Sequence, residues 1–146
     1  MPGITIGVDG SHNSEQALEW AVREAALRHA TLTVLTVHEV AASHWTGSPI
    51  VLPDVDQPAQ QKVYQATEDL VAKVTSQLGG TQPPQVSVRA VSGFAARELI
   101  EASRNSDLLV VGSRGGGGFS RLMLGSVSSQ IVHHAACPVV VVPTDR

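Results

Sequence analysis

The sequence is poor in the features that mark several classes of protein. It has a single cysteine, Cys137, so no intrachain disulfide can form and a reducing compartment is the simpler assignment. No apolar run approaches the roughly 20 residues of a membrane-spanning helix. The N-terminal "MPGITIGVDGS" lacks the basic and apolar regions of a signal peptide. We therefore expect a soluble, cytoplasmic protein.

Basic runs and aromatic residues are also scarce. The formal net charge is −3 and no block of Lys or Arg is present, so the charge pattern of nucleic-acid or anionic-membrane binding is missing. Aromatic residues make up 3% of the chain and hydrophobic residues 42%, which predicts a core of Val, Leu, Ile and Ala. A chain of 146 residues has the size of one ordinary domain, here residues 1–146.

Short β-branched runs alternate with amphipathic helical patterns along the chain. This alternation is typical of an α/β, doubly wound fold with a parallel sheet. The predicted strands are Ile4–Val8, Leu32–Val37, Gln85–Val91, Asp107–Gly112 and Pro138–Pro143. The predicted helices carry apolar stripes at Ala17–Ala25, Val63–Leu78, Ala96–Ile100 and Val127–Ala135. Between them, His38–Pro58 is too long for an ordinary connection and too rich in Pro, Gly and Ser for a helix, so we predict a loop over a site.

A glycine-rich stretch follows the fourth predicted strand. The segment from Gly112 to Gly125 holds six of the thirteen glycines, and Gly125 and Ser126 open the last predicted helix. Glycine is unfavourable in ordered structure unless unusual dihedral angles or a close ligand require it. Bare backbone N–H groups approach phosphate oxygens closely, and the positive end of the helix favours the same anion. This arrangement predicts a phosphate site at the carboxyl end of the sheet.

Two other phosphate-binding patterns do not fit. A Walker A loop needs a lysine before Ser or Thr, and no lysine follows Lys73. The first strand is followed by "GVDGS" rather than by a dinucleotide-binding GxGxxG. That strand ends instead on a carboxylate, Asp9. Asp9 is suited to accept a hydrogen bond from a ribose hydroxyl, to help hold a phosphate-bound divalent ion, or to cap the first helix.

The glycine spacing resembles that of a known family. Gly112, Gly115, Gly125 and Ser126 match the pattern GxxG, nine residues, then G followed by Ser or Thr. This pattern is similar to that of the ATP-binding branch of the universal stress proteins. The resemblance covers nearly the whole chain through "GVDGS", "ALEWAVREAA", "DLLVVGSRG" and "HHAACPVVVVP".

The resemblance implies a fold and a set of contacts with ATP. It implies an open five-stranded parallel sheet in the order 3-2-1-4-5, with helices on both faces. ATP, accompanied by Mg²⁺ or Mn²⁺, would lie over the strand ends, with Asp9 at the ribose or metal and the backbone of Val37 at the adenine edge. The full implied set of nucleotide contacts is Asp9, Val37, Val111, Gly112, Arg114, Gly115, Gly125, Ser126, Val127 and Ser128. Gly116 stands where the family often has a basic residue, which weakens the expected phosphate binding.

Several other residues have a simpler structural interpretation. His133, His134 and Cys137 suggest a metal site, but adjacent helical residues point about 100° apart and do not easily share one ion. Histidines near a helix C-terminus are favoured by the helix dipole, so we expect no metal site. Asp107 is interpreted as a structural turn residue. In the long loop, His44 and Trp45 are better candidates for a loop anchor or dimer contact than for stacking on adenine.

The sequence thus predicts an ATP-binding regulator of the stress response. No base or lysine is placed beside the phosphate loop, so we expect binding rather than turnover and assign no catalytic residue. By resemblance, the last strand, Val139–Val142, pairs with its symmetry mate in a homodimer. Three alternatives stay open: a nucleotide-free dimeric interaction module, a binder of AMP or cyclic AMP, and a weak ATPase.

Overall fold

Strands and helices alternate strictly in the computed structural model. The structure describes residues 3–9, 12–39, 57–80, 82–113 and 125–143. The elements are β1 (Gly3–Val8), α1 (His12–Arg28), β2 (Leu32–Glu39), α2 (Gln57–Ser76), β3 (Val86–Gly93), α3 (Ala95–Ser103), β4 (Ser106–Gly112), α4 (Ser126–His134) and β5 (Val139–Val142). The predicted alternation of five strands with four helices is confirmed.

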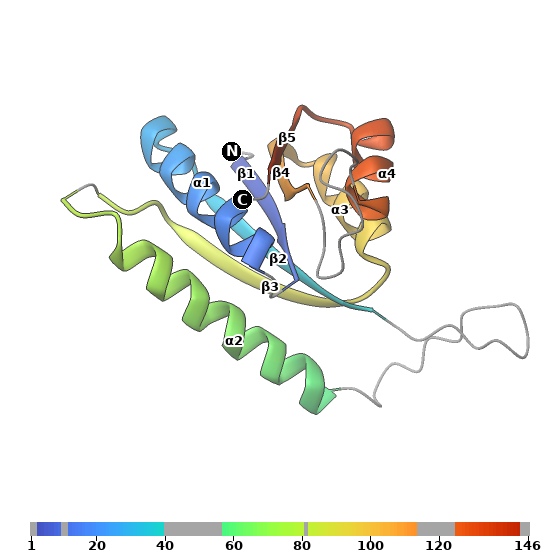
Figure 1. The fold of residues 1–146 in the computed structure, drawn as a ribbon, viewed down its shortest axis with the longest axis horizontal. Helices are drawn as coiled ribbons and strands as arrows, with labels where there is room; N and C mark the ends of the chain where they lie inside the picture. The colour runs from blue at the N-terminus through green and yellow to red at the C-terminus, as the bar shows by residue number, and fades with distance from the viewer. Residues whose placement is uncertain (1–2, 10–11, 40–56, 81, 114–124, 144–146) are drawn as a thin grey trace, which may run out of the picture.

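The strands form one parallel sheet in the order β3-β2-β1-β4-β5. Helices α1 and α2 lie on one face of the sheet and α3 and α4 on the other (Figure 1). The chain winds outward from β1 to β3 on one side, then returns to β4 and β5 on the other. The predicted fold class and strand order are confirmed, and the order reverses between β1 and β4.

The core is built from small and branched aliphatic side chains. Every buried hydrophobic residue among those described is Ile, Val, Leu or Ala, as the low aromatic content predicts. In α1, the predicted stripe is completely buried; it consists of Ala17, Leu18, Ala21, Val22 and Ala25. Its three alanines let α1 lie close to the sheet, where it contacts β1 and β4.

Several boundaries differ from the predicted ones, most of them by one or two residues. β2 continues through His38 and Glu39 because these residues pair with Ser92 and Gly93, so β3 also runs beyond the predicted Val91. Helix α2 begins at Gln57 and includes Pro58 in its first turn. Proline is tolerated there because a backbone N–H at that position would have no acceptor within the helix. The predicted loop is therefore shorter at both ends. Residues 40–56, which include His44 and Trp45, lie outside the described residues.

The first two helices end with left-handed backbone. After α1, His29 adopts φ 53°, its N–H donates to the Ala26 carbonyl, and the Ala30 N–H donates to the Ala25 carbonyl. This pattern of bonds satisfies the last carbonyls of a helix. After α2, Gly79 and Gly80 adopt φ angles of 51° and 72°, which glycine accepts without steric strain. The helix itself ends at Ser76, and a turn at Gln77 and Leu78 joins it to the glycine pair.

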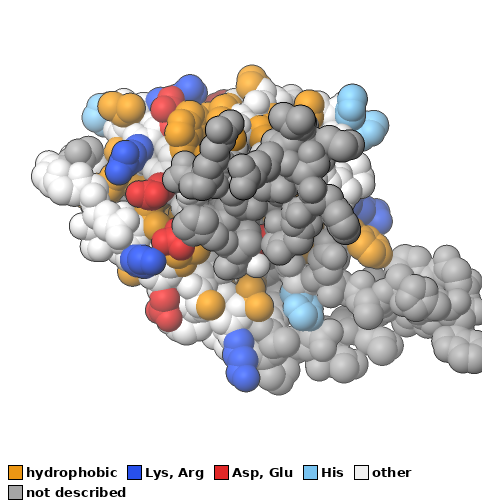
Figure 2. Space-filling view, in the orientation of Figure 1, with side chains coloured by type: hydrophobic (Ala, Val, Ile, Leu, Met, Phe, Trp, Pro, Cys, Tyr) orange, Lys and Arg blue, Asp and Glu red, His pale blue; other side chains and the backbone are white. Residues whose placement is uncertain are grey.

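Charged side chains are distributed over the helix surfaces. Acidic and basic groups are interspersed over the face seen in Figure 2. One ion pair joins two helices: Lys73 Nζ of α2 lies 2.9 Å from Glu15 Oε1 of α1. Within the described ranges, no helix has both the length and the apolar character needed to cross a membrane.

Two leucines of α1 provide a matched test of this packing. Leu18 is fully buried, whereas Leu27 is 75% exposed. We expect Leu18→Ala to lower the free energy of unfolding by about 2–5 kcal/mol, because it leaves a cavity between helix and sheet. Leu27→Ala should change it by less than about 0.5 kcal/mol. Urea denaturation measures both, and equal losses would contradict the packing described.

Candidate functional site

The pairing of β1 with β4 stops short of the carboxyl end of the sheet, and the place where these two strands are no longer paired is called the crevice below. Their ladder ends at Ile6 and Val110, although β1 continues to Val8 and β4 to Gly112. β4 stays paired with β5 up to Gly112. The two central strands therefore part at the point where the strand order reverses, which is where open parallel sheets bind ligands.

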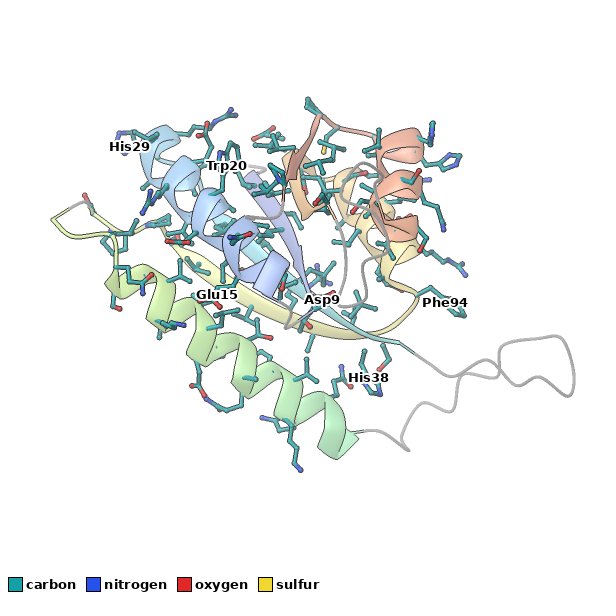
Figure 3. The ribbon with its side chains drawn as sticks, in the orientation of Figure 1. Asp9, Glu15, Trp20, His29, His38 and Phe94 are labelled. Atoms are coloured by element: carbon teal, nitrogen blue, oxygen red, sulfur yellow. The ribbon has the colours of Figure 1, made fainter. Side chains whose placement is uncertain are left out.

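Asp9 lies at the mouth of this crevice. It directly follows β1 and lies beside the start of α1 (Figure 3), and its side chain is exposed. Its backbone N–H donates to Ser14 Oγ at 3.3 Å. Ser14 is the third residue of α1 and is buried. The first helix thus bonds the Asp9 backbone N–H, and the Asp9 side chain lies on the accessible surface.

Val37 presents a backbone carbonyl on the other side of β1. The Ile4 N–H donates to the Thr31 carbonyl. Every second residue from Thr31 to Val37 therefore directs its backbone N–H and carbonyl at β1. The ladder between the two strands ends at Val8 and Thr36, while β2 continues to Glu39. The Val37 carbonyl therefore lies at the crevice end of the ladder, where β1 supplies no further donor.

The ends of the glycine-rich stretch are joined directly. The Gly125 N–H donates to the Ser113 carbonyl at 2.7 Å, and the Ser113 N–H donates to the Val142 carbonyl at 2.9 Å. These bonds attach the start of α4 to the ends of β4 and β5. Arg114, Gly115 and Gly116 lie outside the described residues.

The first turn of α4 lies beside Gly112 and holds backbone N–H groups that have no acceptor within the helix. Gly125 is the N-cap, with φ −64° and ψ 163°, and no side chain caps the helix. The Ser129 N–H bonds to the Gly125 carbonyl, so the N–H groups of the three preceding residues have no acceptor within the helix. Those residues are Ser126, Val127 and Ser128. Their N–H groups and the positive helix end favour a bound anion.

The two serines of this turn have different environments. Ser126 is exposed, whereas Ser128 is buried and its hydroxyl donates to the Gly112 carbonyl at 2.6 Å. The Ser128 hydroxyl therefore holds α4 against β4, and its backbone N–H is the group left for a ligand. Val111 is buried and Val127 half-buried in the apolar cluster under α3 and α4.

The histidines and the cysteine do not form a cluster with these groups. His133 and His134 are exposed in the last turn of α4, with ring centroids 6.4 Å apart and planes tilted by 59°. Burial, and then the charge of Asp107, raise the pKa of the Cys137 thiol, which disfavours the thiolate that binds metals. Asp107 lies within β4 rather than in a turn. Among the described residues, no three His, Cys, Asp or Glu side chains are grouped as metal ligands.

Sequence reasoning missed two residues that build the site. The Ser14 hydroxyl accepts the Asp9 N–H, whereas Ser113 acts through its backbone N–H and carbonyl; neither belongs to the glycine pattern. The signal for Ser14 was its place one turn into a helix that follows Asp9, where a hydroxyl reaches back to the preceding backbone. Ser113 gave no signal, because any residue except proline supplies the same N–H and carbonyl.

A family model described as "Universal stress protein family" matches residues 2–143. A universal stress protein of Mycolicibacterium smegmatis is 36% identical over 143 residues, which are 98% of this chain and 48% of the relative. The universal stress protein Rv2623 of Mycobacterium tuberculosis is 36% identical over 141 residues, 96% of this chain and 47% of the relative. The chain thus spans about half the length of the curated relatives it matches.

Solved structures share the fold. UspA from Lactobacillus plantarum superimposes with a TM-score of 0.73 at 24% identity, covering 97% of both chains. A universal stress protein in complex with cAMP gives 0.71 at 23% identity, covering 99% of this chain and 98% of the other. One from Archaeoglobus fulgidus in complex with dAMP gives 0.61 at 18% identity, covering 97% of both.

The structural role of the Ser128 hydroxyl is tested by a matched pair of substitutions. Ser128→Ala should lower the free energy of unfolding by about 1–3 kcal/mol, because the Gly112 carbonyl loses a buried donor. Ser126→Ala removes an exposed hydroxyl from the same helix turn and should change it by less than about 0.5 kcal/mol. Urea denaturation distinguishes them. Indistinguishable stabilities would mean that the Ser128 bond does not hold the helix.

Proposed function

This chain belongs to the universal stress protein family, and on that premise we propose that it binds ATP, with Mg²⁺ or Mn²⁺, as a nucleotide-dependent regulator of the stress response in the cytoplasm. One observation carries the proposal. The N-terminal turn of α4 adjoins the end of β4, beside the crevice that opens where β1 and β4 part. Backbone donors for an anion therefore lie next to the strand ends where the strand order reverses, which is where open parallel sheets bind ligands.

The proposed contacts serve three parts of the nucleotide. The phosphates would accept from the backbone of Ser126, Val127 and Ser128, together with Arg114 and Gly115. Asp9 would accept from a ribose hydroxyl or bind the divalent ion. The Val37 carbonyl would accept from the amino group of adenine, which guanine lacks at that position. The proposed site is thus the full set of contacts that the family resemblance implies, with backbone groups as the main donors.

A triphosphate suits the site better than a monophosphate. The glycine pattern supplies donors from both ends of the stretch, near Gly112 and near Gly125, which is more than one phosphate needs. Two related structures are complexes with cAMP and dAMP. AMP and cyclic AMP are therefore the competing ligands, and the titration below includes them.

Binding without rapid turnover follows from the available side chains. Both lysines of the chain, Lys62 and Lys73, lie on α2 rather than on the elements that line the crevice. Phosphoryl transfer depends on cationic groups and on a base that orients the nucleophile. Asp9 is the described carboxylate at the crevice mouth. At most, we expect slow ATP hydrolysis.

The two edges of the sheet differ in a way that supports a homodimer through β5. At the β3 edge, Gln60 Nε2 of α2 donates to the Ala90 carbonyl at 2.8 Å, and so occupies an outward-facing backbone group. At the other edge, no described strand pairs beyond β5, whose four residues are all valine. An uncovered apolar edge strand favours pairing with another copy.

The ladder fixes which groups of β5 are available. The Leu109 N–H donates to the Pro138 carbonyl and the Ser113 N–H to the Val142 carbonyl, so alternate residues face β4. Val139 and Val141 therefore direct their N–H and carbonyl groups outward. Antiparallel pairing about a two-fold axis at Val140 would join Val139 of each copy to Val141 of the other.

Loss of ATP binding in a Gly125 variant tests the nucleotide proposal. The φ and ψ of Gly125 are accessible to any residue, so Gly125→Val should fold normally while its side chain blocks the phosphates. We expect calorimetric titration with Mg-ATP to show at least about a tenfold loss of affinity, as for the loss of charge-assisted bonds. AMP and cyclic AMP are titrated in parallel.

The matched control is Ala135→Val at the opposite cap of the same helix. Ala135 has nearly the same dihedral angles, φ −64° and ψ 148°, and lies away from the crevice. It should retain wild-type affinity. Folded wild-type protein that binds none of the three nucleotides would refute the proposal and favour the nucleotide-free interaction module. Tighter binding of cyclic AMP than of ATP would reassign the ligand.

A proline in β5 tests the dimer. Val141→Pro removes an outward-facing N–H but leaves the bonds of Pro138, Val140 and Val142 to β4 in place. We expect it to convert a dimer into a monomer in sedimentation equilibrium at micromolar concentration. Val141→Ala keeps the N–H and should remain dimeric. A proline variant that stays dimeric would place the interface elsewhere.

A further inference from the structure

Two buried serines occupy equivalent places on either side of the crevice. Ser14 is the third residue of α1, which follows β1, and Ser128 is the third residue of α4, which follows β4 and the glycine-rich stretch. Both are 5% exposed. Each hydroxyl bonds back to the backbone at the end of the preceding strand: Ser14 Oγ accepts from the Asp9 N–H, and Ser128 Oγ donates to the Gly112 carbonyl.

Ser14 supplies an acceptor that the sheet does not. The ladder of β1 with β4 ends at Ile6, and the ladder with β2 ends at Val8. Neither neighbouring strand therefore accepts the N–H of Asp9, the next residue. The Ser14 hydroxyl accepts this N–H instead, from a buried position on a helix that packs against the core. The bond therefore attaches the Asp9 backbone to a rigid element.

We propose that Ser14 is a positioning residue for nucleotide binding, which holds the Asp9 backbone so that the carboxylate is directed at the crevice. The inference rests on the proposed function, since Asp9 is there the group that meets the ribose or the metal. A fixed backbone sets the direction of the Cα–Cβ bond, which leaves the side chain fewer conformations to lose on binding.

A positioning role separates Ser14 from a residue that touches the nucleotide. Ser14 is buried and its hydroxyl accepts the Asp9 N–H. A positioning role therefore predicts that its effect on affinity passes through the Asp9 carboxylate. If the carboxylate is absent, loss of the Ser14 hydroxyl should no longer matter. Non-additivity of the two substitutions is therefore the expected signature.

Ser103 provides a matched control at the other end of the sheet. It is also a buried serine, and its hydroxyl accepts the Ala136 N–H at 2.8 Å. Ser103 lies at the end of α3, before the amino end of β4, so it is remote from the crevice. Ser103→Ala removes the same kind of bond as Ser14→Ala without changing the surroundings of Asp9.

The first arm of the experiment uses nucleotide-free protein and NMR-detected amide exchange. Ser14→Ala should accelerate exchange of the Asp9 amide by about tenfold or more, in keeping with the loss of one hydrogen bond. Ser103→Ala should leave that amide unchanged and accelerate exchange at Ala136 instead. Unchanged Asp9 exchange in Ser14→Ala would overturn the proposal, whatever the protein binds.

The second arm measures the dissociation constant of Mg-ATP. Ser14→Ala should raise it by about threefold to tenfold, the equivalent of one hydrogen bond, and Ser103→Ala by less than about twofold. In an Asp9→Ala background, adding Ser14→Ala should change it by less than about twofold. If Ser14→Ala raised the dissociation constant by the same factor with and without the Asp9 carboxylate, the positioning role would be overturned. The substitution would then act through a general effect on the fold.

The two arms distinguish failure of the inference from failure of the proposed function. If the wild-type protein binds no Mg-ATP, the proposed function is wrong, and with it the claim that Ser14 positions Asp9 for a nucleotide. The exchange arm then still determines whether Ser14 holds the Asp9 backbone. If Mg-ATP binds and the exchange of Asp9 does not respond to Ser14→Ala, only the positioning inference is wrong.

Discussion

The end of the β1–β4 ladder is the constraint on which the rest of the site depends. Because the chain winds outward from β1 in one direction and from β4 in the other, the connections after these strands leave toward opposite faces of the sheet. Backbone pairing between them stops at Ile6 and Val110, before either strand ends. By the alternation of the two ladders, Gly7 and Gly112 direct their backbone groups across this gap, where the ladder no longer joins them. A ligand bound at these strand ends would meet such backbone groups.

Hydrogen bonds then attach the helices to the ends of these strands. Gly125 is joined to Ser113, and Ser128 to Gly112, so the donors of α4 keep their place relative to β4 through bonds at the base of the glycine-rich stretch. Ser14 makes the corresponding attachment for α1. An anion site that relies on a helix terminus needs this kind of fixation, because the field of the helix dipole falls off within one turn.

Much of the fold was predictable because its signals are local. Strands covered on both faces read as β-branched runs, and the alanine-rich stripe of α1 has the helical period, so element type followed from residue type. The missed boundaries depend on distant residues instead. His38 is strand because Ser92 lies opposite it, and no pattern near His38 reports that pairing. The site divides in the same way: the glycine spacing indicated Gly112 and Gly125, whereas the bonds of Ser14 and Ser113 depend on how the strands end.

The presence of glycine at position 125 has a reason other than conformation. Gly79 and Gly80 adopt positive φ angles, which explains glycine at those positions. Gly125 adopts φ −64° and ψ 163°, in the broad extended region that serine, threonine and aspartate also occupy at helix N-caps, where their side chains would bond to the free N–H groups. A capping side chain would stabilise α4 by satisfying those donors itself. Glycine leaves them to another acceptor and removes the atoms that would stand in its way. The N-cap of α4 is thus less stabilising than the fold permits, which is the expected property of a helix terminus whose acceptor is a ligand.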